Sequence, residues 1–206
     1  MAGLVAACRA AGVRDERVLA AIGAVDRAGF VPSGSEAGAG RDAPVAIPHG
    51  QVTTQPSLVA RMVEALALDG SERVLEVGAG LGYQAAVLAA LAAEVWSVEW
   101  RADLAEAAAA NLAAAGVANA GVVAGDGTCG LPAHAPYDAI VVAAAFGTVP
   151  PPLAKQLVPG GRLVQPIGPG GAEDVTLFAE RDGGLVRVRT VCGAHFVRLH
   201  GRFGYR

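Results

Sequence analysis

The sequence has little of what marks a disulfide-rich, zinc-binding or nucleic-acid-binding protein. Its three cysteines, Cys8, Cys129 and Cys192, are widely spaced and form no C-x-x-C pair, which argues against a disulfide framework and a structural zinc site. Charged residues make up only 17% and the net charge is −3, so no broad basic surface is expected to grip nucleic acid. We expect packed, reduced thiols, no metal site and no nucleic-acid partner.

The chain also lacks the long apolar segment of a membrane protein. Its strongest apolar run, near residues 85–93, is far shorter than the ~20 residues that a membrane span needs. The first residues have no basic segment, and Arg9 interrupts their apolar stretch, which does not fit a signal peptide. We expect a cytoplasmic protein that does not associate with membranes. Hydrophobic residues still reach 53%, enough to fill a large core.

Apolar periodicity predicts an α/β protein. Helical patterns occur over 14–28 and after Pro56, with a Gly-, Pro- and Ser-rich loop over 32–44 between them. From residue 73 onward, apolar strands alternate with helices. The strands are expected over 73–77, 94–99, 120–125, 137–145 and 161–168, and the helices over 83–92, 101–116 and 151–157. This alternation predicts a doubly wound, mostly parallel Rossmann-like sheet covered by helices on both faces.

The same patterns also predict the last strands and a division of the chain near residue 70. Residues 174–181 and 185–191 alternate like antiparallel strands, and 195–199 is a candidate edge strand. We expect residues 1–70 to form a helical, substrate-facing segment packed on the main domain, and residues 71–206 to form a ligand-binding domain. In such sheets the ligand lies at the carboxyl ends of the strands.

The first strand leads into a glycine-rich turn, EVGAGLGYQ (76–84), with Glu76, Gly78, Gly80 and Gly82 at alternate positions. Glycines at a strand-to-helix turn permit a tight bend and close approach of a ligand. The dinucleotide fingerprint G-x-G-x-x-G fails, because the third glycine comes one residue early. In a glycine-rich chain such a turn alone is not specific.

Two acids sharpen this interpretation. Glu99 ends the second strand, where a carboxylate can accept hydrogen bonds from two ribose hydroxyls, and Asp126 in GDG (125–127) ends the third strand, where it can reach an adenine amino group. The alternative is that both acids only cap the helices that follow. The three features in this order resemble the S-adenosylmethionine-dependent methyltransferases.

The segment before this domain narrows the resemblance. DAPVAIPHGQVTTQP (42–56) is similar to D-R-P-L-P-I-G-x-G-Q-T-I-S-Q-P, and VDRAGFVP (25–32) and VLEVGAGLGYQAAVLA (74–89) also match motifs of the protein-L-isoaspartate O-methyltransferase family. The resemblance extends over about residues 14–201. It implies methyl transfer from S-adenosylmethionine to the α-carboxylate of L-isoaspartyl residues in damaged proteins or peptides, which begins repair through a succinimide, by an enzyme expected to be monomeric.

The resemblance also implies site residues. The cofactor set is Gln51, Val52, Thr53, Glu76, Gly78, Gly80, Gly82, Glu99, Asp126 and Gly127; the substrate set is Thr54, Val197 and Arg198, with Thr54 as the catalytic candidate. A carboxylate acceptor, with a pKa near 4, is already ionised at pH 7. No general base is then required, which agrees with the lack of an obvious catalytic His/Asp pair.

Four residues depart from the family pattern: Gly40 stands where the family often has tyrosine, Val52 replaces threonine, and Thr54 and Arg198 also differ. Thr54 stands where the family has serine; its hydroxyl can orient the acceptor carboxylate, or it can form a local turn or a helix cap. Arg198 replaces a proline and either pairs with an acidic group of the substrate or is a solvated charge. His49 is expected to be a loop residue near the site and not catalytic.

Two other functions stay open at this point. One is a carboxyl methyltransferase for an aspartate of a dedicated peptide, or for another carboxylate; the lack of an added recognition domain disfavours it. The other is a cofactor-binding relative without transferase activity, which the intact glycine and acid set disfavours.

Overall fold

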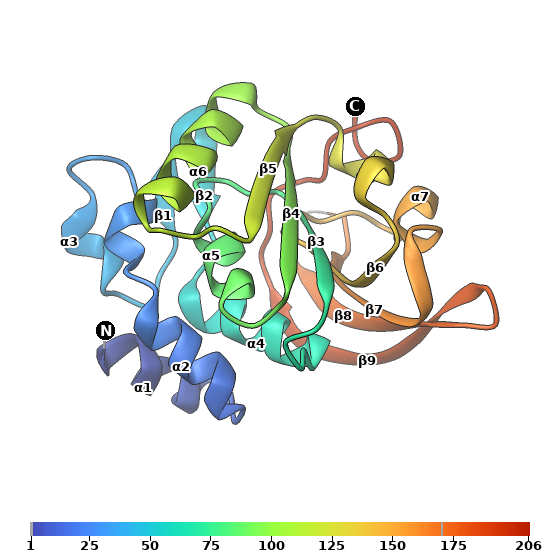
Figure 1. Ribbon diagram of the computed structural model, residues 1–206, viewed down its shortest axis with the longest axis horizontal. Coiled ribbons are helices and arrows are strands. Elements are labelled where there is room, and N and C mark those ends of the chain that lie inside the picture. Colours follow the sequence, from blue (N-terminus) through green and yellow to red (C-terminus); the bar gives the residue numbers. More distant parts are fainter. Residues whose placement is uncertain (1, 170) are drawn as a thin grey trace.

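The computed structural model describes residues 2–169 and 171–206, and Figure 1 shows its helices, strands and termini. Three helices of the amino-terminal third pack together: α1 (Ala2–Ala10), α2 (Glu16–Ala24) and α4 (Pro56–Leu66). Local signals set where two of them begin. The Asp15 side chain accepts the Arg17 N–H and caps α2, and Pro56 occupies the first turn of α4.

The segment between α2 and α4 contains several short elements. These are the 3-10 turn η1 (Arg27–Phe30), the single-turn helix α3 (Glu36–Ala39), the strand β1 (Val45–Ile47), the turn η2 (Pro48–Gly50) and the strand β2 (Gln51–Thr53). β1 and β2 form an antiparallel hairpin in which Val45 lies opposite Thr53. The sequence did not predict this hairpin, because strands of three residues are too short for a period of two to stand out.

The main sheet confirms the predicted fold class. Its order is β5-β4-β3-β6-β7-β8-β9. The strands are β3 (Arg73–Val77), β4 (Glu94–Glu99), β5 (Ala120–Ala124), β6 (Tyr137–Val142), β7 (Leu157–Ile167), β8 (Glu173–Arg181) and β9 (Gly184–Ala194). Neighbours from β5 to β7 are parallel, and β8 and β9 are antiparallel. The strand order reverses beside β3, so the carboxyl ends of β3, β4 and β6 form the expected ligand crevice.

Different helices and turns pack on the two faces of the sheet. One face packs under α1, α2, α4, α5 (Tyr83–Ala89) and α6 (Ala102–Ala114), as seen in Figure 1. The other face is covered by the turns η3 (Gly127–Cys129) and η4 (Pro132–His134) and the single-turn helix α7 (Pro151–Ala154). Alternation along β3 supplies both cores: Val74 belongs to the first, and Leu75 and Val77 belong to the second.

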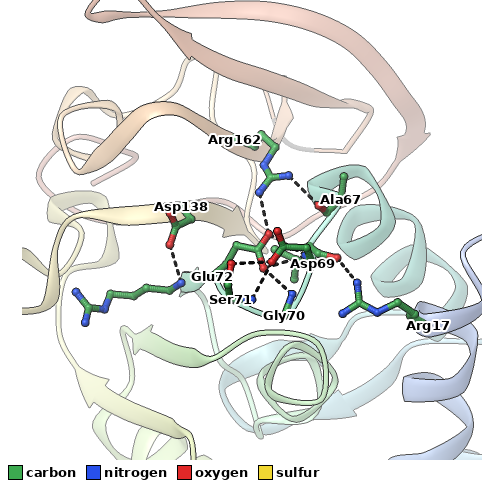
Figure 2. A network of polar contacts seen from close by, with 10 residues as sticks. Arg17, Ala67, Asp69, Gly70, Ser71, Glu72, Asp138 and Arg162 are labelled. Carbon is green, nitrogen blue, oxygen red and sulfur yellow. Dashed lines mark hydrogen bonds and ion pairs between the residues drawn. The ribbon is translucent and has the colours of Figure 1, made fainter.

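A polar network ties the amino-terminal helices to the sheet at the end opposite the crevice (Figure 2). The buried Glu72 carboxylate accepts hydrogen bonds from the amides of Asp69 and Gly70 and from Arg162 of β7. The Arg17 guanidinium donates to the Leu68 carbonyl from the side of α2. A buried carboxylate with several donors fixes the turn before β3 firmly.

Several sequence-based boundaries were wrong. Helix α1 was not predicted, and residues 195–199 form no strand: Arg198 makes only an isolated parallel bridge with Ala145. The helix expected over 151–157 ends at Ala154, because the Gln156 carbonyl accepts the Tyr137 N–H and the chain joins the sheet. In the described residues, no helix is long and apolar enough to cross a membrane. The division near residue 70 stays a prediction.

Candidate functional site

The glycine turn after β3 forms the floor of the crevice. Gly78, Gly80 and Gly82 all have positive φ, at 94°, 56° and 96°, a region that other residues adopt only with strain. The Gly78 N–H donates to the Val98 carbonyl at 2.8 Å, which holds the turn against β4. The turn therefore presents bare backbone toward the crevice.

Glu99 stands at the end of β4 and faces this turn. Its carboxylate accepts the Gly80 N–H at 2.9 Å and the Arg101 N–H at 3.0 Å, and the residue is 7% exposed. The Arg101 N–H precedes α6, which begins at Ala102 and has no side-chain cap, so the capping alternative for Glu99 has only this local contact. The carboxylate also lines the crevice, and an anionic oxygen can accept more than one hydrogen bond.

A cavity, called the first cavity below, lies in this crevice. Its walls come from the β1–β2 hairpin, the glycine turn, the ends of β4 and β6, and the segment 197–200. It collects most of the predicted cofactor residues: Gln51, Val52, Thr53, Gly78, Gly80, Glu99 and Gly127. A Cβ on Gly127 would meet a Val77 methyl at 2.5 Å, so this position has no room for a side chain.

Three predicted cofactor residues lie outside the lining. Glu76 is fully buried beneath the turn and receives the Ser97 hydroxyl hydrogen bond; burial raises the pKa of its carboxyl to about 7, against the opposing effect of Ser97. Gly82 packs against α6, where a Cβ would lie 3.2 Å from the Ala108 carbonyl oxygen. Their local roles are thus structural, whatever they contribute to a ligand.

Asp126 is the third of these residues. Its carboxylate accepts the Thr128 N–H at 2.9 Å, the Thr128 hydroxyl at 2.6 Å and the Arg202 N–H at 2.7 Å. This matches the capping alternative for η3, and it also ties the carboxy-terminal segment to the end of β5. Its contact with adenine stays a prediction.

Two polar side chains at the start of α5 were missed by the sequence reading. Tyr83 and Gln84 line the first cavity and are 4% and 6% exposed; the Tyr83 hydroxyl has no hydrogen-bond partner in the described structure, whereas the Gln84 amide lies close to the Glu76 carboxyl. Burial raises the pKa of Tyr83 to about 12, so it stays a neutral donor. Unpaired buried polar groups are costly, and they indicate a place for a polar ligand.

A second cavity meets the first. It runs between the start of α4 and the segment 192–197, and is lined by residues such as Gln55, Arg61, His195 and Phe196. Both cavities share Val52, Thr53, Thr54, Ala143 and Val197. The structure therefore brings two cavities together at these shared residues, two of which are Thr53 and Thr54.

Thr54 is the junction of the two cavities. Its hydroxyl makes no hydrogen bond to another residue of 2–169 or 171–206, and Gln55, the residue before α4, provides no side-chain cap. The turn and cap alternatives for Thr54 therefore have no contact to support them, and the hydroxyl is free to donate to a ligand.

The predicted substrate residues of the last segment are divided between the cavities. Val197 lines both, because its carbonyl accepts the Ala145 N–H and fixes the segment along the end of β6. Arg198 lines only the first cavity, with its guanidinium carbon 5.0 Å from the centre of the Tyr205 ring. A direct pairing of Arg198 with an acceptor in the second cavity has no contact in its favour.

Other lining residues were also missed. Trp100, 50% exposed, directly follows Glu99 and lines the first cavity; its adjacency to that acid was a usable signal. Arg61 lines the second cavity, and its guanidinium donates to the Val191 carbonyl of β9. No sequence signal joins Arg61 to β9. In the described chain, no group of three or more His, Cys, Asp or Glu residues is placed to hold a metal.

Comparisons with known proteins show the family. The model of the family described as protein-L-isoaspartate(D-aspartate) O-methyltransferase matches residues 2–204. A protein-L-isoaspartate O-methyltransferase of Methanoculleus marisnigri is 50% identical over 200 residues, covering 96% of this chain and 90% of the relative. One of Anaeromyxobacter dehalogenans is 50% identical over 190 residues, covering 91% of each chain.

Solved structures show the same architecture. A protein-L-isoaspartate O-methyltransferase superposes with a TM-score of 0.86 at 30% identity, covering 98% of this chain and 66% of that longer chain. A Plasmodium falciparum protein in complex with S-adenosyl-L-homocysteine superposes with a TM-score of 0.77 at 23% identity, covering 96% of each chain. The second comparison bears on the fold alone.

Proposed function

Because this chain belongs to the protein-L-isoaspartate(D-aspartate) O-methyltransferase family, we propose that it transfers a methyl group from S-adenosylmethionine to the α-carboxylate of L-isoaspartyl residues in proteins or peptides. The observation that carries the proposal is the meeting of two cavities at Thr54. A transfer between two bound molecules needs such a junction, where the reacting atoms can approach to about 3–3.5 Å.

The first cavity fits S-adenosylmethionine. Bare backbone at Gly78 and Gly80 allows close approach of a ligand, the Glu99 carboxylate can accept hydrogen bonds from ribose hydroxyls, and the Tyr83 hydroxyl is unpaired. When bound there, S-adenosylmethionine would supply an electrophilic methyl group on a sulfonium. We assign the predicted cofactor residues that line this cavity to its binding.

The chain's own contribution is alignment. An acceptor carboxylate with a pKa near 4 carries its negative charge at pH 7, so no residue has to remove a proton. Thr54 would donate its hydroxyl hydrogen bond to one carboxylate oxygen and leave the other directed at the methyl group. Orientation of this kind can contribute roughly 7–11 kcal/mol to lowering a barrier. Val197 and Ala143 would close the sides of the junction.

The acceptor is tested with a matched pair of peptides, one isoaspartyl and one aspartyl, and S-adenosylmethionine labelled in its methyl group. Label on the isoaspartyl peptide alone is the expected result. Label on the aspartyl peptide would support the alternative, a carboxyl methyltransferase for normal aspartate. Binding of S-adenosyl-L-homocysteine without transfer to either peptide would contradict the proposed acceptor.

We also propose that the parts of the chain before and after residue 70 both contribute to the site. Residues before it supply the hairpin and the start of α4, which face both cavities, and residues after it supply the glycine turn and Glu99. The segment 192–197 belongs to the later part but lines the second cavity. The substrate-facing surface is therefore shared between the two parts of the chain.

A further inference from the structure

A buried cation lies behind the junction threonine. Arg27 of η1 is 2% exposed, and its guanidinium donates to the carbonyls of Ala39, Arg41 and Ala43 at 3.3, 3.0 and 2.9 Å, and to the Thr53 hydroxyl at 2.7 Å. No carboxylate hydrogen-bonds to it in the described chain. A buried guanidinium is costly without such partners. The Tyr83 ring, with its centre 5.7 Å from the guanidinium carbon, and the negative charge of Asp42 also favour the cation, and so many contacts around one residue point to a role beyond filling space.

The loop that Arg27 binds also carries an acid directed at the other side of the junction. The Asp42 carboxylate accepts the Gln55 side-chain amide at 2.8 Å and the Ser57 N–H at 2.8 Å. Arg27 thus holds the loop by its carbonyls, and the loop holds the start of α4 by one carboxylate. The two contacts come from adjacent positions, 41–43, of a segment with no regular structure.

The two anchors lie on both sides of Thr54. Thr53 is bound by Arg27, and its hydroxyl also accepts the Val45 N–H at 3.1 Å. Gln55 is bound by Asp42. Thr54 itself has no hydrogen-bonding side-chain partner within the described residues, so its position depends on its neighbours. The residue that faces both cavities is fixed from behind and keeps its own hydroxyl free.

We propose that Arg27 and Asp42 are positioning residues for methyl transfer: through Thr53 and Gln55 they fix the backbone that aims Thr54 at the acceptor. This inference rests on the proposed function. It assigns neither residue a contact with substrate or cofactor. It predicts that their loss disorders the junction and leaves the glycine turn, with its own anchors on β4, in place.

The test uses Asp42→Asn and Arg27→Lys, with Arg41→Met as a matched control. Asparagine keeps one acceptor for the Ser57 N–H but cannot accept from Gln55 with its amide nitrogen, and lysine keeps the charge but not the planar set of donors. The Arg41 side chain is exposed and lies one residue from Asp42, with only its backbone carbonyl bound to Arg27. It should behave as the unchanged protein.

The measurements separate positioning from folding. For Asp42→Asn and Arg27→Lys, we expect the KM for an isoaspartyl peptide to rise about tenfold or more and kcat to fall. The Kd for S-adenosyl-L-homocysteine should rise by a smaller factor, because Gln51, Val52 and Thr53 line the first cavity while the glycine turn and Glu99 keep their own anchors. Amide hydrogen exchange should speed up over residues 43–57 and stay unchanged over 76–82. Unchanged peptide kinetics in both variants, or equal loss of peptide and S-adenosyl-L-homocysteine affinity, would overturn the inference.

Failure of this inference is distinct from failure of the proposed function. If the unchanged protein methylates no isoaspartyl peptide, the proposed function fails, and hydrogen exchange over 43–57 still reports whether Arg27 and Asp42 order the junction. If Arg27→Lys does not fold, Asp42→Asn gives the same test at a partly exposed position.

Discussion

The two cavities that meet at Thr54 are built in different ways. The floor of the first is a local motif: the glycine turn after β3 and the acid at the end of the next strand, joined by the Gly80–Glu99 hydrogen bond. The second is assembled from segments far apart in sequence, such as Arg61 and Val191, which hydrogen-bond across 130 residues. The first can be damaged by one backbone change, whereas the second depends on how distant segments are held.

The largest effect is expected on the stability of the folded protein, from the carboxyl of Glu76 beneath the first cavity. The pKa of its buried carboxyl is raised to about 7 from the ordinary value of 4.5, so the folded protein binds this proton more tightly than the unfolded chain. The resulting stability is full below pH 4.5 and is lost as the pH rises to about 7, by on the order of 3 kcal/mol. Glu76→Gln, which cannot ionise, should lose this pH dependence.

Urea unfolding at pH 5 and pH 8 measures this difference. The exposed Glu106 is a matched control, and Glu106→Gln should keep the pH dependence of the unchanged protein. Equal pH dependence in Glu76→Gln and the unchanged protein would show that the carboxyl titrates normally despite its burial.

The next effect tests the bare backbone of the glycine turn. Gly78→Val places a branched side chain at φ 94° with its Cβ 3.5 Å from the Ala143 Cβ, and the turn must move to relieve the strain. Since such strain costs about 1–3 kcal/mol, we expect up to about 100-fold weaker binding of S-adenosyl-L-homocysteine by calorimetry. Gly147→Ala, where a Cβ meets nothing within 4 Å, is the control. Affinity within twofold in a folded Gly78→Val protein would contradict this account.

The same contrast explains what could be predicted from sequence. The parallel sheet and the glycine turn were predictable because strand–helix alternation and the spacing of Gly78, Gly80 and Gly82 are local patterns. The reach of Glu99 into the first cavity also followed from its place at the end of a strand. These features need no knowledge of how distant segments meet.

The rest depended on long-range packing. The hairpin of β1 and β2 is too short to show a period, and the second cavity needs Arg61 beside β9. The Asp126 carboxylate accepts the Arg202 N–H from 76 residues away, which no spacing rule anticipates. The buried Arg27 reads in sequence as an ordinary charged residue, because only tertiary structure removes it from water.

A third prediction addresses the junction. Thr54→Val keeps the shape of the side chain but removes the hydroxyl donor, so kcat/KM for an isoaspartyl peptide should fall about 10- to 100-fold, as for a lost hydrogen bond to a charged group. Affinity for S-adenosyl-L-homocysteine should change by less than about threefold. Thr54→Ser, which keeps the donor, should retain activity within a few-fold. Full activity in Thr54→Val would remove the orienting role.

The smallest effect, on the dissociation rate of S-adenosyl-L-homocysteine, is expected from the contact between the β1–β2 hairpin and α6. His49 Nε2 lies 2.7 Å from the Asp103 carboxylate, and this contact lowers the pKa of Asp103. The hydrogen bond therefore persists above the ordinary pKa of Asp103, 3.8, and is lost only as the pH falls through the lowered value. Both side chains are largely exposed, so water and salt weaken the pair.

The pair lies beside the first cavity, whose wall includes Ile47 of the hairpin and Leu104 of α6. His49→Asn should raise the dissociation rate of S-adenosyl-L-homocysteine by less than about threefold at pH 7, and 0.5 M salt should abolish the difference. Asparagine tolerates the positive φ of 62° at this position, so backbone strain does not confuse the result. Asp103→Asn should change the dissociation rate by the same factor as His49→Asn.

Ile47→Ala provides the contrasting variant. Ile47 packs with Leu81 and Leu104 in a small buried cluster. Ile47→Ala should raise the dissociation rate of S-adenosyl-L-homocysteine more than His49→Asn does, because buried apolar contact outweighs an exposed pair. The hairpin belongs to the segment that also carries Thr54, so it joins the local cavity to the assembled one. A larger effect from His49→Asn than from Ile47→Ala would mean that charge, and not packing, holds this connection.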